Sequence, residues 1–212
     1  MTSNPLLTAY RRLRYGRPIV VVSGLPRSGT SMAMKMLAAG GVEVITDGER
    51  SADEDNPEGY YEDERVKELA RMEDKAWLAE ARGKAIKIIS FLLRELPAEH
   101  NYKVLFMRRD MEEILASQQK MLARRDEDDD TEDERMAKLF EADLFRARYL
   151  MKRAPQFEFV EIHYRDALAD PLAAARTMRD FLGAELDLER MVGVVDPELY
   201  RNRKERLEAA AS

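Results

Sequence analysis

A short apolar run that passes directly into a glycine-rich loop constrains the fold of this chain more than any other feature. Residues 19–23 (IVVVS) are continuous and rich in valine, which is typical of a strand covered on both faces. The loop GLPRSGTS occupies residues 24–31, and residues 31–39 have the apolar pattern of a helix. A buried strand, a loop and a helix in this order predict an α/β fold.

Strand and helix patterns alternate along the rest of the chain. The further strand candidates are residues 42–45, 85–89, 103–107 and 157–163. The further helix candidates are residues 62–81, 111–124, 132–152 and 171–182. We therefore predict a single domain over residues 1–212, with a core at 18–195 and peripheral segments at 1–17 and 201–212. The predicted architecture is a P-loop-like three-layer sandwich, with about five parallel strands flanked by helices.

Two polar stretches interrupt this alternation. Residues 46–59 (TDGERSADEDNPEG) contain Asp-Gly and Asn-Pro pairs and predict a long loop. The acidic run 126–130 lies within RDEDDDT. We interpret it as a solvated connection between helices, and the alternative is a mobile acidic flap that attracts a cationic acceptor. The tail 201–212 predicts a loosely held helix.

The composition excludes several classes of function. The 41 Asp and Glu residues outnumber the 35 Lys and Arg residues, and the net charge of −6 is a poor match for a general nucleic-acid surface. Cysteine is absent, which removes thiol catalysis and cysteine–zinc sites, and two histidines are too few for a histidine-rich metal site. No apolar stretch approaches the roughly 20 residues of a membrane span. We expect a cytoplasmic protein that needs no metal and binds neither nucleic acid nor membrane.

The loop at residues 24–31 has the spacing of a phosphate-binding loop. Gly24, Gly29 and Ser31 follow the Walker A pattern, except that Thr30 stands where that pattern has lysine. Glycines allow successive backbone N–H groups to surround an anion, and the helix N-terminus behind them adds partial positive charge. Arg27 supplies a full positive charge. Hydroxyl donors are available at Ser28, Thr30 and Ser31.

The alternative for this loop is a tight strand–helix turn whose glycines serve packing only. The position between a clear strand and a clear helix favours phosphate binding. The missing lysine argues against ATP or GTP hydrolysis, because that lysine reaches the β- and γ-phosphates. Asp110 and Asp166 are the nearest candidates for Mg²⁺ ligands, and both are better explained as helix starts.

Four segments carry motifs that can be compared with known families. They are PRSGTS at 26–31, NPEGYYE at 56–62, VLFMRRDMEEILAS at 104–117, and HYRDALADP at 163–171 followed by RDFLG at 179–183. Together they resemble the family of PAPS-dependent sulfotransferases, where PAPS is 3′-phosphoadenosine-5′-phosphosulfate. Residues 26–31 are similar to the family's 5′-phosphosulfate loop, residues 104–117 to its 3′-phosphate segment, and residues 163–183 to its third segment, whereas NPEGYYE is similar to a motif of many bacterial members. The three main segments stand in family order over residues 19–183.

The resemblance implies where the nucleotide binds. The loop residues Arg27, Ser28, Gly29, Thr30 and Ser31 correspond to the 5′-phosphosulfate site. Arg109 and Ser117 correspond to the 3′-phosphate site, and Tyr164 to a residue beside the adenine. Open α/β sheets bind ligands at the carboxyl ends of their strands, where Arg27 and Arg109 are expected. The alternatives are that Arg108 and Arg109 form ion pairs with Asp110, Glu112 or Glu113, and that Tyr164 is a core-edge tyrosine.

Lys87 lies in an otherwise apolar strand candidate, AIKII at 85–89. Lysine is rarely buried without a partner, which favours a functional position. The family has a lysine at the matching strand end. With Arg27, Lys87 is therefore our candidate for neutralising charge on the leaving group during sulfuryl transfer.

The catalytic base is where this chain departs from the family's best-known pattern. Cytosolic members have a histidine two residues after the lysine, and here that residue is Ile89. We expect His100 at the surface, at the wrong end of the sheet, and His163 nearer the nucleotide than the acceptor. Other branches use a glutamate, and Glu62 is our first candidate. The alternatives are Glu58, Glu49 and Asp63, and any of these acids could instead favour a helix N-terminus.

The expected activity is transfer of a sulfuryl group from PAPS to a hydroxyl or amine of a small-molecule acceptor, with release of the nucleotide product, PAP. The acceptor's identity and the oligomeric state are not encoded in these motifs. The alternatives are a catalytically inactive nucleotide-binding scaffold, since the usual histidine is missing, and an atypical P-loop kinase.

Overall fold

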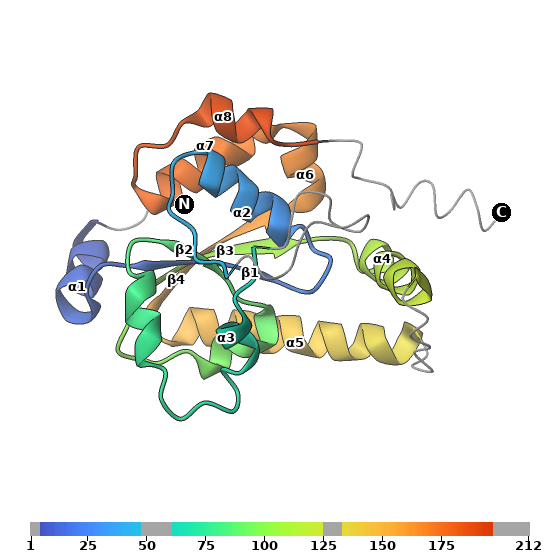
Figure 1. Cartoon of the computed structure of the whole chain (residues 1–212), viewed down its shortest axis with the longest axis horizontal. Coiled ribbons are helices and arrows are strands. Elements are labelled where there is room, and N and C mark those ends of the chain that lie inside the picture. Colours follow the sequence, from blue (N-terminus) through green and yellow to red (C-terminus); the bar gives the residue numbers. More distant parts are fainter. Residues whose placement is uncertain (1–4, 48–60, 125–132, 197–212) are drawn as a thin grey trace.

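Four parallel strands form the centre of the protein, as seen in a computed structural model that describes residues 5–47, 61–124 and 133–196 (Figure 1). The strand order is β2-β1-β3-β4. The strands are β1 (Ile19–Gly24), β2 (Ala85–Lys87), β3 (Tyr102–Arg108) and β4 (Phe157–His163). All three pairings are parallel, as the alternation of strand and helix patterns predicted.

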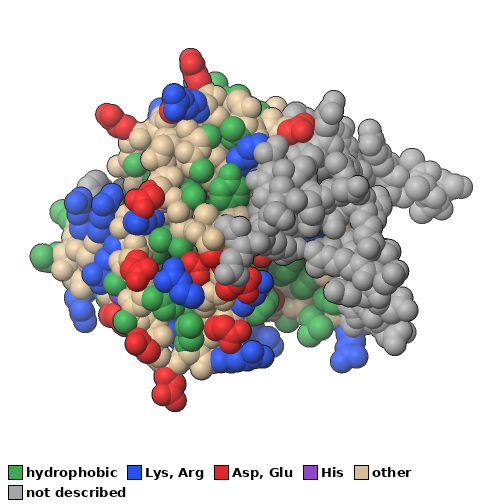
Figure 2. All heavy atoms as spheres, in the orientation of Figure 1, with side chains coloured by type: hydrophobic (Ala, Val, Ile, Leu, Met, Phe, Trp, Pro, Cys, Tyr) green, Lys and Arg blue, Asp and Glu red, His purple; other side chains and the backbone are tan. Residues whose placement is uncertain are grey.

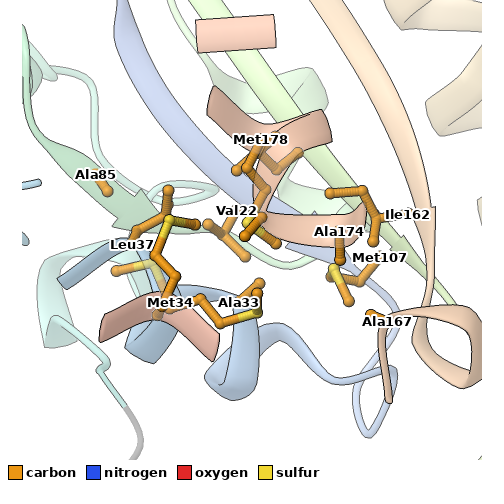
Figure 3. Packing of buried hydrophobic residues seen from close by; sticks show 14 of the residues in the cluster. Val22, Ala33, Met34, Leu37, Ala85, Met107, Ile162, Ala167, Ala174 and Met178 are labelled. Atoms are coloured by element: carbon orange, nitrogen blue, oxygen red, sulfur yellow. The ribbon is translucent and has the colours of Figure 1, made fainter. Parts of the chain in front are cut away.

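Both faces of the sheet are covered, because successive side chains of each strand point to opposite sides. Val20 and Val22 of β1 pack into one hydrophobic cluster, and Ile19 and Val21 pack into the other. The first cluster, seen closely in Figure 3, lies under α2 (Thr30–Ala39), α6 (Tyr164–Ala169), α7 (Pro171–Leu182) and α8 (Leu188–Gly193). The second lies under α3 (Glu64–Lys67), η1 (Ala76–Ala81), η2 (Ser90–Glu95) and α5 (Asp133–Arg153). This arrangement is the predicted three-layer sandwich.

The sheet has four strands and not the five we expected. Residues 42–45 form only an isolated parallel bridge, between Val44 and Ala85. The next residues turn away from the sheet, because the hydroxyl of Thr46 and the amide of Asp47 both donate to the carbonyl of Glu62, at 2.9 and 3.1 Å. Residues 42–47 therefore run from the edge of β2 to Glu62, and they do not add a fifth strand to the sheet.

The predicted helix at residues 62–81 is wrong, because the segment is broken into α3, a turn and η1. The Asp63 carboxylate caps the start of α3 by accepting from the amide of Arg65. Asp74 accepts from the amide of Ala76 at 2.9 Å, an alternative to helical hydrogen bonding that Asp commonly adopts. Val66 and Leu69 are buried as their spacing suggested, so the apolar pattern indicated the core-facing side but not the continuity of the helix.

The other helices predicted within the described residues are confirmed. Helices α7 and α4 (Met111–Arg124) have the predicted bounds, and α2 and α5 differ from prediction by a residue at their ends. We did not predict α1 (Pro5–Tyr15), α6, α8 or η2; three of these four elements are six residues long, too short for periodicity to be decisive.

Lys103 at the start of β3 is buried and shows how this fold uses a strand lysine structurally. Its ammonium group donates to the carbonyls of Phe181 and Leu182, at 2.7 and 3.1 Å, at the end of α7. A cation is favourable there because the last carbonyls of a helix carry partial negative charge. Burial lowers the pKa of Lys103 below its usual value.

The described surface mixes charges of both signs. On the face seen in Figure 2, Lys and Arg side chains alternate with Asp and Glu side chains. Every helix within residues 5–47, 61–124 and 133–196 is too short or too polar to cross a lipid bilayer.

The predictions for residues 48–59, for the acidic run 126–130 and for the tail 201–212 lie outside the described residues. The cytoplasmic location and the division into one domain stay predictions.

Candidate active site

The carboxyl ends of the four parallel strands meet at one edge of the sheet. Val22 pairs with Lys87, and Gly24 pairs with Met107, so the end of β2 and the end of β3 flank the loop that follows β1. Arg108 pairs with His163, which brings the end of β4 to the same edge. The loop after β1 and helix α4 extend beyond this edge (Figure 1). Parallel topology alone therefore brings together the predicted phosphate loop, Lys87, Arg109 and Tyr164.

The loop at residues 24–31 is held by its own hydrogen bonds and by β3. The Ser28 hydroxyl donates to the Leu25 carbonyl at 2.7 Å, so it serves the loop itself. A Cβ on Gly24 would lie 2.6 Å from the Met107 carbonyl oxygen, which requires glycine there. Arg27 has a φ of 65°, a left-handed conformation that is uncommon outside glycine and is often found at functional sites.

Helix α2 starts immediately behind this loop. Its N-cap residue, Gly29, has a φ of 96°, and no side chain among the described residues caps the helix. The first turn of a helix leaves backbone N–H groups without intrahelical partners, and a phosphate or sulfate group satisfies them well. The loop therefore fits an anionic group through its backbone, with Thr30 buried and Ser31 half-buried in the first turn.

Arg27 connects this loop to α4. Its Nε donates to the Ser117 hydroxyl at 2.9 Å, although the two residues are 90 positions apart in the chain. Ser117 is buried. The residue predicted for the 5′-phosphosulfate end and one predicted for the 3′-phosphate end are thus in direct contact.

The Arg109 side chain is largely buried and makes three contacts with other described residues. Its Nε donates to the Glu113 carboxylate at 3.0 Å, and its Nη1 donates to the Arg27 carbonyl at 3.0 Å. Its guanidinium carbon lies 4.8 Å from the centre of the Tyr164 ring, a cation–π contact. The side chains of Arg109 and Glu113 are only 9% and 3% exposed, so little water reaches this pair. The ion pair that we named as the alternative for Arg109 is therefore present.

The Tyr164 ring packs against both Arg109 and the loop. A Cβ at Gly29 would come within 2.3 Å of the Tyr164 ring, so the ring lies directly against the backbone of the loop. The residue is 7% exposed, and burial raises the pKa of its phenol above the usual value. The ring fits the description of a core-edge tyrosine, and a contact with adenine stays a prediction.

Lys87 and Glu62 form the second ion pair of the site. Lys87 Nζ lies 3.1 Å from a Glu62 carboxylate oxygen and 3.3 Å from the Ser31 hydroxyl. The side chains are 9% and 22% exposed. Lys87 is thus positioned between the first turn of α2 and the carboxylate that we predicted as the base. Tyr61, next to Glu62, has a φ of 49°, and it and Arg27 are the two non-glycine residues with positive φ in the described ranges.

The competing candidates for the base differ in position. Asp63 is buried and binds Arg65, whose guanidinium lies 2.8 Å from the Asp63 carboxylate and 4.3 Å from the centre of the Trp77 ring. This carboxylate raises the pKa of Arg65 further. Asp63 therefore has a structural partner, and Glu62 is directed to Lys87. Glu49 and Glu58 lie outside the described residues.

The histidines do not join this site in the way that a base requires. We expected His100 at the surface, and this is wrong: it is 5% exposed, with its Nδ1 3.1 Å from Arg82 and its ring 6.2 Å from that of Tyr102. Burial lowers the pKa of His100. It precedes β3 and so lies at the opposite edge of the sheet, as predicted. His163 ends β4 and is exposed.

Other predicted residues have structural roles. Asp110 accepts from the amide of Glu112 at 3.0 Å directly before α4, and Asp166 lies in the first turn of α6, as expected of helix starts. Arg108 points to Glu161, at 3.9 Å. The contact of Tyr164 with Gly29 was not predicted, because the two residues are far apart in the chain and no local pattern indicates it. No group of three metal-binding side chains occurs within the described ranges.

Comparison with known proteins identifies the family. A model described as the sulfotransferase family matches residues 66–188, more than half of the chain. A sulfotransferase domain from the curacin biosynthetic pathway is similar in structure, with a TM-score of 0.52 and 14% identity over 92% of this chain and 96% of that chain. At this identity the similarity shows the fold.

Two further solved structures are more distant. A sulfotransferase from Alicyclobacillus acidocaldarius has a TM-score of 0.49 and 16% identity, over 92% of this chain and 91% of that chain. A retinol dehydratase, in complex with androsterone and PAP, has a TM-score of 0.47 and 15% identity, over 92% and 68%. No curated protein matches. The family match spans β2, β3 and β4 and their site residues, and on this ground the chain belongs to the sulfotransferase family.

Proposed function

We propose that this sulfotransferase takes the sulfuryl group from PAPS and passes it to a hydroxyl or amine of a small-molecule acceptor, with Glu62 as the base. PAPS carries anionic groups at two ends and needs a cationic site for each. The loop with Arg27 is suited to the 5′-phosphosulfate, and Arg109 with Ser117 to the 3′-phosphate. Arg27 contacts both Ser117 and Arg109. These contacts support the proposal, because they join the two anion sites into one preformed surface for a single nucleotide.

The leaving group needs positive charge where its bridging oxygen becomes an anion. Lys87 is suited to this role because its ammonium lies against Ser31, in the helix turn that follows the phosphate loop. Arg27 adds charge from the loop. Preorganised cations in a site with little water stabilise such a charge far more than exposed cations do. Lys87 is 9% exposed, which meets that condition.

The acceptor must lose a proton as its oxygen or nitrogen bonds to sulfur. In the proposed step, the acceptor–sulfur bond forms, the bond from sulfur to the bridging oxygen breaks, and the acceptor proton passes to the Glu62 carboxylate. PAP leaves with the electron pair of the broken bond. The observation that carries this proposal is the 3.1 Å contact between Lys87 and Glu62, because it holds the proposed base beside the proposed leaving-group cation.

The test is a comparison of Glu62→Gln with Glu64→Gln. Glu64 lies two positions away and is half exposed, paired with Lys67 on the surface of α3. We expect Glu62→Gln to lose roughly 10²–10⁴-fold in turnover, the usual contribution of a general base. Its affinity for PAP, measured by calorimetry, should stay within about threefold of the original, and Glu64→Gln should change neither quantity.

Four results would contradict the proposal. Full turnover in Glu62→Gln removes Glu62 as the base. PAP binding that survives both Arg27→Ala and Arg109→Ala removes the nucleotide site. PAP binding without sulfuryl transfer to any member of a broad acceptor panel favours the inactive scaffold, and Mg²⁺-dependent ATP turnover favours the kinase.

A further inference from the structure

Glu113 is a buried acid at a place where an anionic nucleotide is expected to bind. It is 2% exposed and lies in the first turn of α4, four residues after Arg109. Side chains of a helix lean toward its N-terminus, so a residue at this spacing reaches back over the residue that precedes the helix. The start of α4 is fixed by Asp110, whose side chain accepts from the Glu112 amide and whose carbonyl accepts from the Ile114 amide, both at 3.0 Å.

Three contacts with other described residues approach the guanidinium of Arg109 from different directions. Glu113 binds the Nε edge, the Arg27 carbonyl binds Nη1, and the Tyr164 ring covers one face. A guanidinium is planar and rigid, so fixing its edge, its tip and its face fixes the direction of every N–H donor. Nε carries a single N–H, and Glu113 accepts from it, so loss of the Glu113 carboxylate releases this edge of the guanidinium.

We propose that Glu113 is a positioning residue that fixes Arg109 for the 3′-phosphate and thereby makes the site prefer a 3′-phosphorylated nucleotide. This inference rests on the proposed donor. Two effects of Glu113 on a bound phosphate oppose each other. Its negative charge repels the phosphate, and its hydrogen bond orients the arginine that binds the phosphate. Orientation is the larger effect here, because Arg109 is 9% exposed and water cannot replace the lost partner.

The experiment compares two nucleotides that differ only in the 3′-phosphate, PAP and AMP, by calorimetry. The variants are Glu113→Gln and the matched control Glu112→Gln, which changes an exposed acid one position away. We expect Glu113→Gln to weaken PAP binding about tenfold or more and to leave AMP binding within about twofold. Glu112→Gln should change neither affinity.

A double-mutant cycle separates positioning from a general structural effect. In an Arg109→Ala background, Glu113→Gln should no longer change PAP affinity, because Glu113 acts through Arg109. Should Glu113→Gln fail to fold, as judged by thermal unfolding, Glu113→Asp keeps the charge but shortens the reach, and the same selective loss for PAP is expected.

Three outcomes overturn the inference. Equal loss for PAP and AMP indicates a structural role only. Unchanged or tighter PAP binding in Glu113→Gln indicates that repulsion is at least as large as orientation; the donor assignment survives in that case, since the unmodified protein still binds PAP. An unmodified protein that fails to bind PAP overturns the donor assignment and this inference together.

Discussion

Two ion pairs of nearly equal length lie at the same edge of the sheet, yet they differ in how they are held. Lys87 and Glu62 are 3.1 Å apart and 25 residues apart in the chain; Arg109 and Glu113 are 3.0 Å apart and separated by one helical turn. The Glu62 side chain is 22% exposed and precedes a four-residue helix, whereas the Glu113 side chain is 3% exposed within a helix of 14 residues. The first pair joins separate elements, and we expect it to rearrange during the proposed reaction. The second is a fixed part of the scaffold.

Removal of each cation in turn tests whether the two ion pairs differ in role, and it should produce the largest effects. Lys87→Met should lower turnover roughly 10²–10⁴-fold and leave PAP affinity within about threefold, since Lys87 acts mainly on charge that develops during transfer. Arg109→Met should lower PAP affinity roughly 10–100-fold, as expected for loss of a charged hydrogen bond. Steady-state kinetics and calorimetry measure both. Equal effects of the two variants on affinity and turnover would show that the pairs do not differ in role.

A second test sharpens the idea that the Arg109 end is a fixed scaffold. Gly29→Ala places a Cβ 2.3 Å from the Tyr164 ring, and Gly41→Ala places one with no described atom within 4 Å, although both positions have a φ near 95°. Gly41→Ala should cost about 1–2 kcal/mol of stability from backbone strain alone. Gly29→Ala should cost about 2–5 kcal/mol, because overpacking adds to that strain.

Calorimetry completes this test. PAP affinity should fall roughly tenfold in Gly29→Ala and stay unchanged in Gly41→Ala. Only the former displaces the Tyr164 ring that packs against Arg109. Equal thermal stability of the two variants would contradict the close packing of Tyr164 on the loop.

The smallest expected effect concerns the acid next to Glu62. Asp63→Asn keeps a side chain that caps helices well and loses the charge that binds Arg65. The loss of stability should be about 1 kcal/mol or less, because Arg65 is 39% exposed. Turnover should stay within about threefold. A loss of turnover as large as that expected for Glu62→Gln would transfer the role of base to Asp63.

The sequence predicted those features that depend on local order. A strand that ends at a glycine loop, and a second that ends in Arg109, must meet at one edge if the sheet is parallel, and they do. Helix α7 was predicted to the residue because Asp170 caps its start and Gly183 adopts a left-handed conformation at its end.

What the sequence could not predict depends on contacts between distant segments. His100 is buried with its Nδ1 3.1 Å from Arg82, which lies 18 positions away, and the turn-like residues around His100 do not indicate this contact. Residues 62–81 carry helical spacing, but the helix that Asp63 caps ends at Lys67, and Asp74 binds the Ala76 amide where the helix was predicted to continue. Glu113 was named only as an ion-pair partner, because its value for the site depends on the Arg27 carbonyl and the Tyr164 ring, 82 and 55 residues from Arg109.

The position of Trp77 has a practical consequence. It is the only tryptophan of the chain, and its ring lies 4.3 Å from the guanidinium carbon of Arg65, the residue that binds Asp63 next to the proposed base. The intrinsic fluorescence of the protein therefore originates beside the segment that carries Glu62. We therefore expect any rearrangement of the segment around Glu62 on addition of PAP to change the emission of this single indole, which needs no added label.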